Sequence, residues 1–324
     1  MPFFDMPLEA LETYRPASPE QPDFDTFWDN TLADARSHPI NTQFEPFDAG
    51  TKLVDVFDMQ FSGYGGQPIK AWFMLPANTS EPLPAVVEYI GYGGGRGYPY
   101  SWLKWVAAGF AYMVMDNRGQ GGSGSSPGDT ADYPERSESQ ALGFFTQGIT
   151  DPNHYYYRRL YTDAARAIEA VKTHPLVDTT RIAAVGASQG GALAIAASGL
   201  MAEDVSVCVA DVPGLCDFKR VVGLTGQVPY NEISTYLQTQ RDHVDTVFKT
   251  LSYVDGICFA KRSKAYAYYS TGLMDMICPP SGVYAAFNHV NGPKEIHTYA
   301  FNGHEAGGEV HQFKKIKFLS DRWN

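Results

Sequence analysis

The segment 186–190, Gly-Ala-Ser-Gln-Gly, constrains the fold of this 324-residue chain more than any other, because it joins an expected strand to an expected helix. The apolar run 182–185 precedes it, and the helix-forming run 192–197 follows it. A Gly-x-Ser-x-Gly turn in this setting holds its serine in a strained backbone conformation that only small neighbours permit. The pattern predicts Ser188 as a nucleophile exposed at the bend; a purely structural glycine turn is the alternative.

Strand-like and helical segments alternate from residue 85 onward. This order predicts a single α/β domain over 1–324, with a mainly parallel sheet covered by helices on both faces. The expected strands are 85–90, 111–115, 181–185, 206–210, 265–270 and 295–300. The expected helices are 102–108, 156–172, 191–200, 281–290 and 307–319. Ahead of them, 53–61 and 69–75 predict an antiparallel hairpin.

Two segments lie outside that alternation. Residues 1–50 are expected to form a helical extension, since aromatic and aliphatic side chains recur at helical spacing after residue 23. Residues 213–262 are expected to be an insertion after the strand that follows Ser188. This insertion is either a lid, an oligomer contact, or a pair of surface helices without catalytic consequence.

Composition narrows the classes of function. There is no uninterrupted apolar stretch of about 18 residues, as a membrane span needs, and the acidic start lacks the pattern of a secretion signal, so we expect a cytoplasmic protein. The four cysteines form no Cys-x-x-Cys pair, which argues against a zinc knuckle or a redox dithiol and favours free buried thiols. The formal net charge of −11 disfavours nucleic acid and anionic lipid as partners.

A serine nucleophile needs an imidazole to accept its proton and a carboxylate to orient that imidazole. In this type of fold the three follow the chain order serine, acid, histidine. His304 lies directly after the last expected strand and before the last helix, where a catalytic base belongs. His297, within the strand, and His311, within the helix, are expected to be packing or surface residues.

The acid is expected in the loop after the preceding strand. Asp275 is the carboxylate of that loop, and two prolines at 279–280 stiffen the chain behind it. Asp211 also follows a strand and is the second choice, because some sheets place the acid one strand earlier.

An oxyanion requires backbone N–H donors. One is expected from Gln189, the residue after the nucleophile, and the other from the glycine-rich loop 91–97, where we favour Tyr92. A phosphate-binding role for that loop is disfavoured, because neither glycine fingerprint for phosphate is present.

Together these segments resemble the acetyl xylan esterases of the cephalosporin C deacetylase family over nearly the whole chain. The resemblance rests on six motifs in order: Gly91-Tyr92 with 94–97, Arg118-Gly119-Gln120-Gly121, Asp151-Pro152 with 155–159, the segment 186–191, Asp275 with 278–280, and Gly303-His304-Glu305. It implies an α/β-hydrolase that deacetylates short xylo-oligosaccharides and cephalosporin-type antibiotics without a metal or organic cofactor. It also implies the triad Ser188, Asp275 and His304, oxyanion donors at Tyr92 and Gln189, and an intracellular hexamer with its sites facing an internal cavity.

Two positions depart from the family pattern. Gly93 stands where relatives commonly carry Asn, which implies a looser oxyanion loop. Gly214 stands where some relatives carry Phe near the acyl pocket, which implies tolerance of acyl groups longer than acetyl. Trp105 and Leu215 are expected either to line that pocket or to be ordinary core residues.

Other functions stay open on the sequence alone. A serine peptidase or another short-chain carboxylesterase could use the same triad, and a non-catalytic sugar-binding protein could keep the same fold. We expect no large N-terminal domain of the kind that commonly gates such peptidases, which counts against that function. Arg118 is expected to tie loops together near the site and to take no part in the chemistry.

Overall fold

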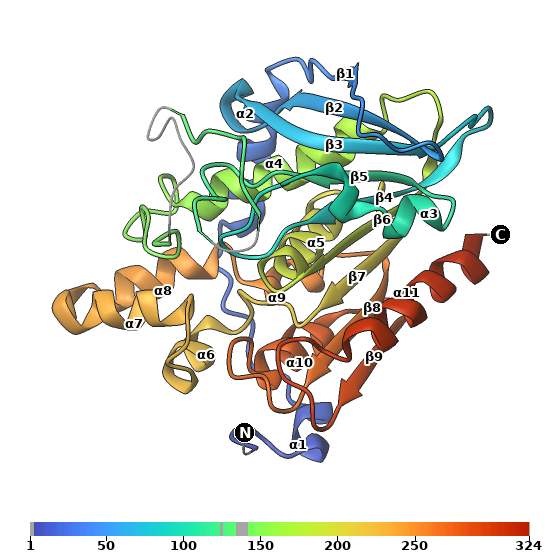
Figure 1. Cartoon of the computed structure of the whole chain (residues 1–324). Coiled ribbons are helices and arrows are strands. Elements are labelled where there is room, and N and C mark those ends of the chain that lie inside the picture. The colour runs from blue at the N-terminus through green and yellow to red at the C-terminus, as the bar shows by residue number, and fades with distance from the viewer. Residues whose placement is uncertain (1–2, 124–125, 134–141, 324) are drawn as a thin grey trace.

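The computed structural model describes residues 3–123, 126–133 and 142–323. Within them, one nine-stranded sheet has the order β1-β2-β3-β5-β4-β6-β7-β8-β9 (Figure 1). The strands are β1 (Gln43–Pro46), β2 (Val54–Ser62), β3 (Pro68–Pro76), β4 (Leu83–Tyr89), β5 (Ala111–Met115), β6 (Val177–Ala187), β7 (Val207–Asp211), β8 (Tyr266–Gly272) and β9 (Lys294–Tyr299). Strands β1, β2, β3 and β5 pair antiparallel in turn, and β4 to β9 are parallel. The predicted hairpin and parallel strands are confirmed.

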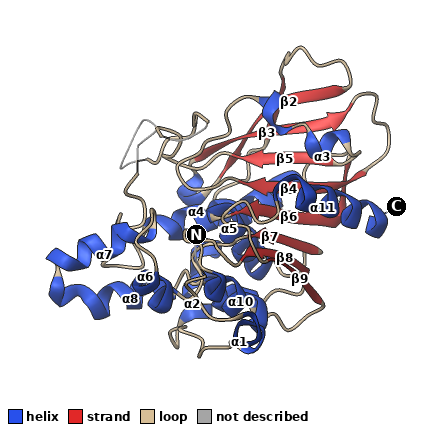
Figure 2. Cartoon of the chain, turned by 60° about the horizontal axis from the view of Figure 1, so that its bottom comes forward, coloured by secondary structure: helices blue, strands red, loops and turns tan. Residues whose placement is uncertain are grey.

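Helices cover both faces of the sheet, as predicted. Helices α2, α4, α5, α9 and α10 lie on one face, while α3 and α11 lie on the other (Figure 2). The helices are α1 (Leu8–Thr13), α2 (Phe24–Arg36), α3 (Lys104–Ala107), α4 (Tyr156–Val171), α5 (Gln189–Leu200), α6 (Phe218–Leu224), α7 (Tyr230–Thr239), α8 (Val244–Ser252), α9 (Gly256–Ala260), α10 (Pro280–His289) and α11 (Gly308–Trp323). None of the helices in the described ranges has the length and apolarity needed to cross a bilayer.

Each strand of the sheet centre feeds two hydrophobic cores, because successive side chains point to opposite faces. In β5, Ala111, Met113 and Met115 pack into the core under α4 and α5, whereas Tyr112 and Val114 pack into the core under α3 and α11. Burial on both faces explains the continuous apolar runs 85–87, 111–115, 182–185 and 207–210 within these strands.

The extension 1–50 is not wholly helical, which corrects the prediction. Residues 43–46 form β1, an edge strand that pairs with β2. The segment carries one large apolar side chain, Phe44, whose ring packs edge-on against Phe73 with centroids 5.1 Å apart. Strand β1 therefore depends on its pairing with β2 and on packing against β3, and so short a segment has no alternation of its own to reveal it.

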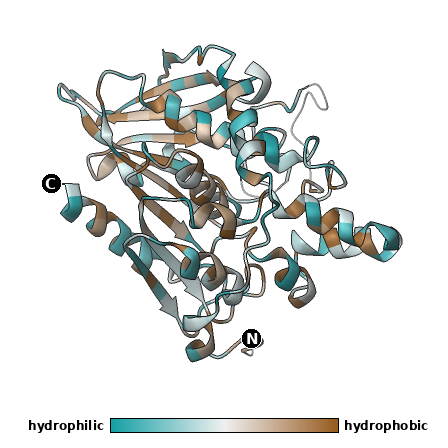
Figure 3. Cartoon of the chain, turned by 180° about the vertical axis from the view of Figure 1, so that it is seen from behind, coloured by the Kyte–Doolittle hydropathy of each residue, from teal (hydrophilic) through white to brown (hydrophobic). Residues whose placement is uncertain are grey.

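The insertion contains α6 to α9. Helix α9 packs against α5 and α10 in the body of the molecule. Helices α7 and α8, in contrast, project beyond the edge of the sheet as a pair with mixed polar and apolar residues (Figures 1 and 3).

Candidate active site

Ser188 occupies the sharp turn between β6 and α5, with φ 59° and ψ −124°. Only glycine fits two residues before Ser188 and two residues after it. A Cβ on Gly186 would lie 2.2 Å from the Gly190 carbonyl oxygen, and a Cβ on Gly190 would lie 2.1 Å from the carbonyl oxygen of Tyr89. The Ser188 N–H donates to the Asp211 carbonyl at 2.9 Å and fixes the turn to β7. The chain thus holds a serine in a strained conformation at the carboxyl edge of the sheet.

An acid and a base meet at the same edge. Asp275 lies in the acid loop (273–279) after β8, and His304 lies in the base loop (300–307) after β9. His304 Nδ1 is 2.8 Å from Asp275 Oδ2, so Nδ1 carries the proton donated to the carboxylate and Nε2 is left to accept one. The other oxygen of the fully buried Asp275 accepts the N–H groups of Ile277 at 2.8 Å and Cys278 at 3.0 Å.

Backbone hydrogen bonds join these two loops. Leu273 N–H donates to the Tyr299 carbonyl, and Met274 N–H donates to the Asn302 carbonyl, each at 3.0 Å. Glu305 stabilises the turn of the base loop by accepting the Asn302 side-chain amide at 2.7 Å. The orientation of the acid toward the base is therefore fixed by main chain as well as by side chain.

The Ser188 hydroxyl lies 3.9 Å from Cys278 Sγ. Ser188 and His304 are both described by the structure, and no hydrogen bond joins them. Structures without substrate commonly leave this bond open. Burial, followed by the charge of Asp275, raises the pKa of the Cys278 thiol, so a neutral sulfur borders the serine.

The two expected oxyanion donors lie on loops that a single side chain connects. Neither the Tyr92 N–H nor the Gln189 N–H has a hydrogen-bond acceptor among the described residues. The buried Gln120 accepts the Gly93 N–H at 2.7 Å and donates its own amide to Gln189 Oε1 at 2.9 Å. This link supports the loop at Gly93, where the sequence implied looseness.

Asp211, the second choice for the acid, does not contact His304. Its carboxylate binds the buried Lys315 ammonium and lies 3.0 Å from His311 Nε2, both on α11. Burial acts to raise the pKa of Asp211, but these two neighbours more than offset it and hold that pKa well below its usual range. Asp275 is the carboxylate that the structure places on the histidine.

A family model described as Acetyl xylan esterase (AXE1) matches residues 1–322. The chain belongs to the acetyl xylan esterase family. A solved acetyl xylan esterase from Paenibacillus sp. R4 is 39% identical, with a TM-score of 0.89 over 98% of this chain and 99% of that one. Acetyl xylan esterase 1 from Thermoanaerobacterium sp. JW/SL YS485 is 32% identical, with a TM-score of 0.89 over 99% and 100%. Acetyl esterase Axe7A of Xylanibacter ruminicola is 26% identical over 92% of this chain and 67% of its own length.

This acetyl xylan esterase family member is a carboxylic ester hydrolase, and its mostly parallel sheet with helices on both faces is the predicted α/β-hydrolase fold. The resemblance stated from the six motifs is confirmed.

Two expected pocket walls are core residues in this family member. Trp105 is fully buried in the core under α3 and α11, where its indole N–H donates to Glu88 at 3.0 Å. Leu215 is 1% exposed and packs in the core on the opposite face of the sheet. Because both side chains are buried, neither is accessible to a ligand. Sequence alone does not show which face of the sheet a buried residue contacts, so it could not decide between pocket and core.

Gly214, in contrast, borders the nucleophile. A Cβ at this position would lie 3.4 Å from Cys278 Sγ, 3.6 Å from the Tyr230 hydroxyl and 3.8 Å from the Ser188 carbonyl carbon. A side chain at position 214 would therefore contact the main chain of the nucleophile turn and the sulfur that borders the Ser188 hydroxyl.

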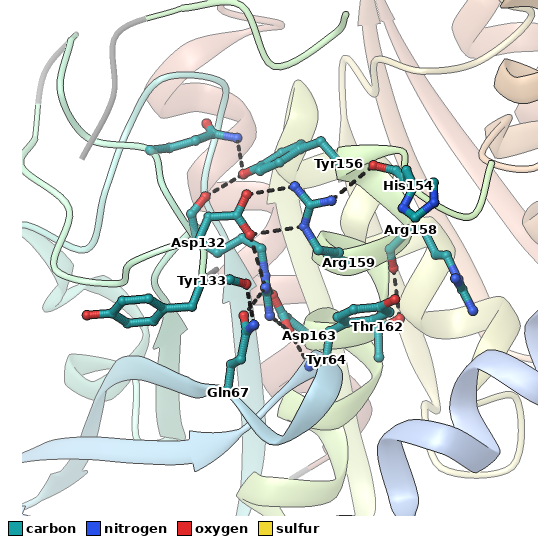
Figure 4. A network of polar contacts seen from close by, with 12 residues as sticks. Tyr64, Gln67, Asp132, Tyr133, His154, Tyr156, Arg158, Arg159, Thr162 and Asp163 are labelled. Atoms are coloured by element: carbon teal, nitrogen blue, oxygen red, sulfur yellow. Dashed lines mark hydrogen bonds and ion pairs between the residues drawn. The ribbon is translucent and has the colours of Figure 1, made fainter. Parts of the chain in front are cut away.

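Arg118 is fully buried and ties together three parts of the chain, as expected of a scaffolding residue. Its partners Gln67, Asp132 and Asp163 lie close together in the polar network of Figure 4. Its guanidinium donates to both oxygens of Asp163 on α4, at 2.5 and 2.8 Å. It also donates to Asp132 at 3.1 Å and to Gln67 of the hairpin at 2.6 Å. A planar fork suits such bidentate pairing.

Proposed function

We propose that this protein is a serine esterase that removes acetyl groups from the hydroxyls of small substrates, such as xylo-oligosaccharides and cephalosporin C, through an acetyl-enzyme intermediate. The observation that carries the proposal is the strained Ser188 at the sheet edge where His304 Nδ1 lies 2.8 Å from Asp275. The names of the relatives support acetyl esters as substrates.

Acylation begins when His304 Nε2 accepts the proton of the Ser188 hydroxyl and Ser188 Oγ forms a bond to the acetyl carbonyl carbon. The negative charge then moves to the carbonyl oxygen, which the N–H groups of Tyr92 and Gln189 stabilise. Breaking the ester C–O bond releases the sugar oxygen, which takes the proton from His304. Asp275 keeps the ring oriented and stabilises its charged form.

Deacylation repeats these steps with water as the nucleophile. His304 accepts a water proton, the new hydroxyl adds to the acetyl carbon, and Ser188 Oγ leaves with the proton from His304. Acetate is released and the resting enzyme is restored. No atom or electron from a metal or organic cofactor is needed for either half.

The test is acetate release from acetylated xylo-oligosaccharides and from cephalosporin C at neutral pH, by wild type and by Ser188→Ala. We expect Ser188→Ala to lose activity on the order of 10⁶-fold in kcat, as when other triad serines are removed. An initial burst of chromophore from a 4-nitrophenyl acetate substrate, absent in the variant, would mark the acetyl-enzyme.

A serine peptidase is the competing function of the same triad. An aminoacyl 4-nitroanilide assayed beside the acetyl esters separates the two. Serine-dependent cleavage of the amide alone, by protein whose circular dichroism is intact, would contradict the esterase proposal. The hexamer and the cytoplasmic location stay predictions, which sedimentation and cell fractionation can check.

A further inference from the structure

One side chain of the insertion, Glu232, contacts the glycine-rich loop that is expected to form the oxyanion hole. Glu232 lies in the first turn of α7 and is half-buried. The Tyr92 phenol donates to Glu232 Oε1 at 2.6 Å, although the two residues are 140 positions apart. Helix α7 projects from the sheet (Figure 2). Its first turn nevertheless contacts Tyr92, the residue expected to supply an oxyanion donor.

The same two side chains collect three consecutive main-chain donors. Gly143 N–H lies 3.0 Å from the Tyr92 oxygen and 3.1 Å from Glu232 Oε1. Phe144 N–H donates to the Tyr92 oxygen at 2.9 Å, and Phe145 N–H donates to Glu232 Oε2 at 3.1 Å. Because its oxygen already accepts N–H groups, the phenol has its one proton free to donate to the carboxylate.

Packing holds the Tyr92 ring on its other sides. The rings of Phe144 and Phe145 meet it edge-on, with centroids 5.9 and 5.4 Å away. Burial first, and then the hydrogen bond to Glu232, raise the pKa of the Tyr92 phenol, which keeps it protonated at working pH. Tyr92 is thus clamped at its phenol by Glu232, while its neighbour Gly93 is bound to Gln120 at 2.7 Å.

We infer that Glu232 is a positioning residue for the oxyanion hole, acting from the insertion through the Tyr92 phenol on the direction of the Tyr92 N–H. The inference rests on the proposed serine esterase function. An N–H donor stabilises an oxyanion only when it is aimed at the place where charge develops, and a displacement of about 1 Å costs on the order of 100-fold in rate. Through Glu232, the first turn of α7 therefore supports the oxyanion loop, which gives this part of the insertion a role in positioning.

The first test compares Glu232→Gln and Glu232→Ala with wild type on an acetyl ester. Gln replaces one of the two acceptor oxygens of Glu232 with an NH₂ group, which would face an N–H or O–H donor that the carboxylate now accepts, and Ala removes both oxygens. We expect kcat to fall about 10-fold in each, with KM changed less than about twofold, because the oxyanion exists only in the transition state. Asp245→Asn is the matched control: it is a first-turn carboxylate of α8 in the same insertion, exposed and without a hydrogen bond among the described residues.

A small trifluoromethyl ketone gives a second readout, since its adduct with Ser188 carries the oxyanion. Its affinity is expected to fall by the same factor as kcat in the Glu232 variants and to stay unchanged in Asp245→Asn. Tyr92→Phe removes the same contact from the other side, so Glu232→Gln added to Tyr92→Phe is expected to cost little more than Tyr92→Phe alone.

The outcomes separate this inference from the proposed function. Activity that survives Ser188→Ala would refute the esterase mechanism. Serine-dependent activity in which Glu232→Gln matches Asp245→Asn, or in which its effect adds fully to that of Tyr92→Phe, would overturn the role of Glu232. Where Glu232→Ala lowers the melting temperature, the ketone affinity of the folded Tyr92→Phe protein decides.

Discussion

At the scale of single residues, the space beside Ser188 depends on Gly214. Any side chain here would start 3.8 Å from the Ser188 carbonyl carbon and in contact with the Cys278 sulfur. Its φ is not in the left-handed region, so other residues can adopt its backbone. The position thus controls volume and leaves the backbone unstrained.

We predict that Gly214→Phe narrows the range of acyl groups. The wild-type enzyme should accept propionyl and butyryl esters, and the variant should lose about 10-fold or more of kcat/KM for butyrate relative to acetate, since one methylene in a pocket is worth about 1–3 kcal/mol. Rates on 4-nitrophenyl esters of increasing chain length measure it, with Gly214→Ala as the intermediate case. Equal losses on acetate and butyrate would contradict the prediction.

At the scale of elements, the turn from β6 to α5 requires β4 to lie directly against it. The close approach of Gly190 to the Tyr89 carbonyl, 2.1 Å from an added Cβ, leaves no room for even a methyl group. Strand β4 leads directly into the glycine-rich loop 91–97. The contact between Gly190 and Tyr89 therefore affects both the nucleophile turn and that loop.

Gly190→Ala is therefore expected to destabilise the protein by about 1–3 kcal/mol, as overpacking of a tight site does, and to lower kcat as well. Gly223→Ala is the control. Its added Cβ meets nothing within 4 Å on the exposed side of α6, and alanine in such a helix gains about 0.5–1 kcal/mol. Urea unfolding of both variants checks the pair; similar stability of the two would show that the contact is not tight.

The sequence predicted elements well where their signal is local. The Gly-x-Ser-x-Gly turn, the hairpin and the parallel strands all carry their own periodicity, and the loops of Asp275 and His304 follow from strand order. Residues that act across the fold have no such signal. Gln120 stood out only through the family resemblance, and Glu232 gave no indication at all. For Trp105 the sequence left pocket wall and core open, and the structure packs it in the core with its indole N–H on Glu88.

At the scale of the whole molecule, α11 joins the C-terminus to the centre of the sheet. Lys315 and His311 on this helix contact the buried side-chain carboxylate of Asp211. The main-chain carbonyl of the same residue accepts the Ser188 N–H. Helix α11 begins at Gly308, directly after the base loop that carries His304. The ion pair between Lys315 and Asp211 therefore links this helix to β7, on which the Ser188 turn is fixed.

Lys315→Met should cost about 3–5 kcal/mol at pH 7, because it leaves the buried Asp211 carboxylate without its ammonium partner and with only His311 and the Ser270 hydroxyl beside it. Adding Asp211→Asn should recover part of that loss. The pKa of Asp211 lies below its unfolded value, so its stabilising effect is complete above about pH 4 and is lost as the pH falls further. Urea unfolding at pH 7 and pH 3 measures this: the gap between wild type and Lys315→Met should narrow in acid, and a constant gap would refute the ion pair.

All the reacting loops leave one edge of the sheet, which makes the molecule strongly two-sided. The connection from β3 to β4, residues 77–82, lies at the opposite edge and is largely exposed. A tag or surface linkage placed there would fix the enzyme to a solid support with its reacting edge turned toward the solution.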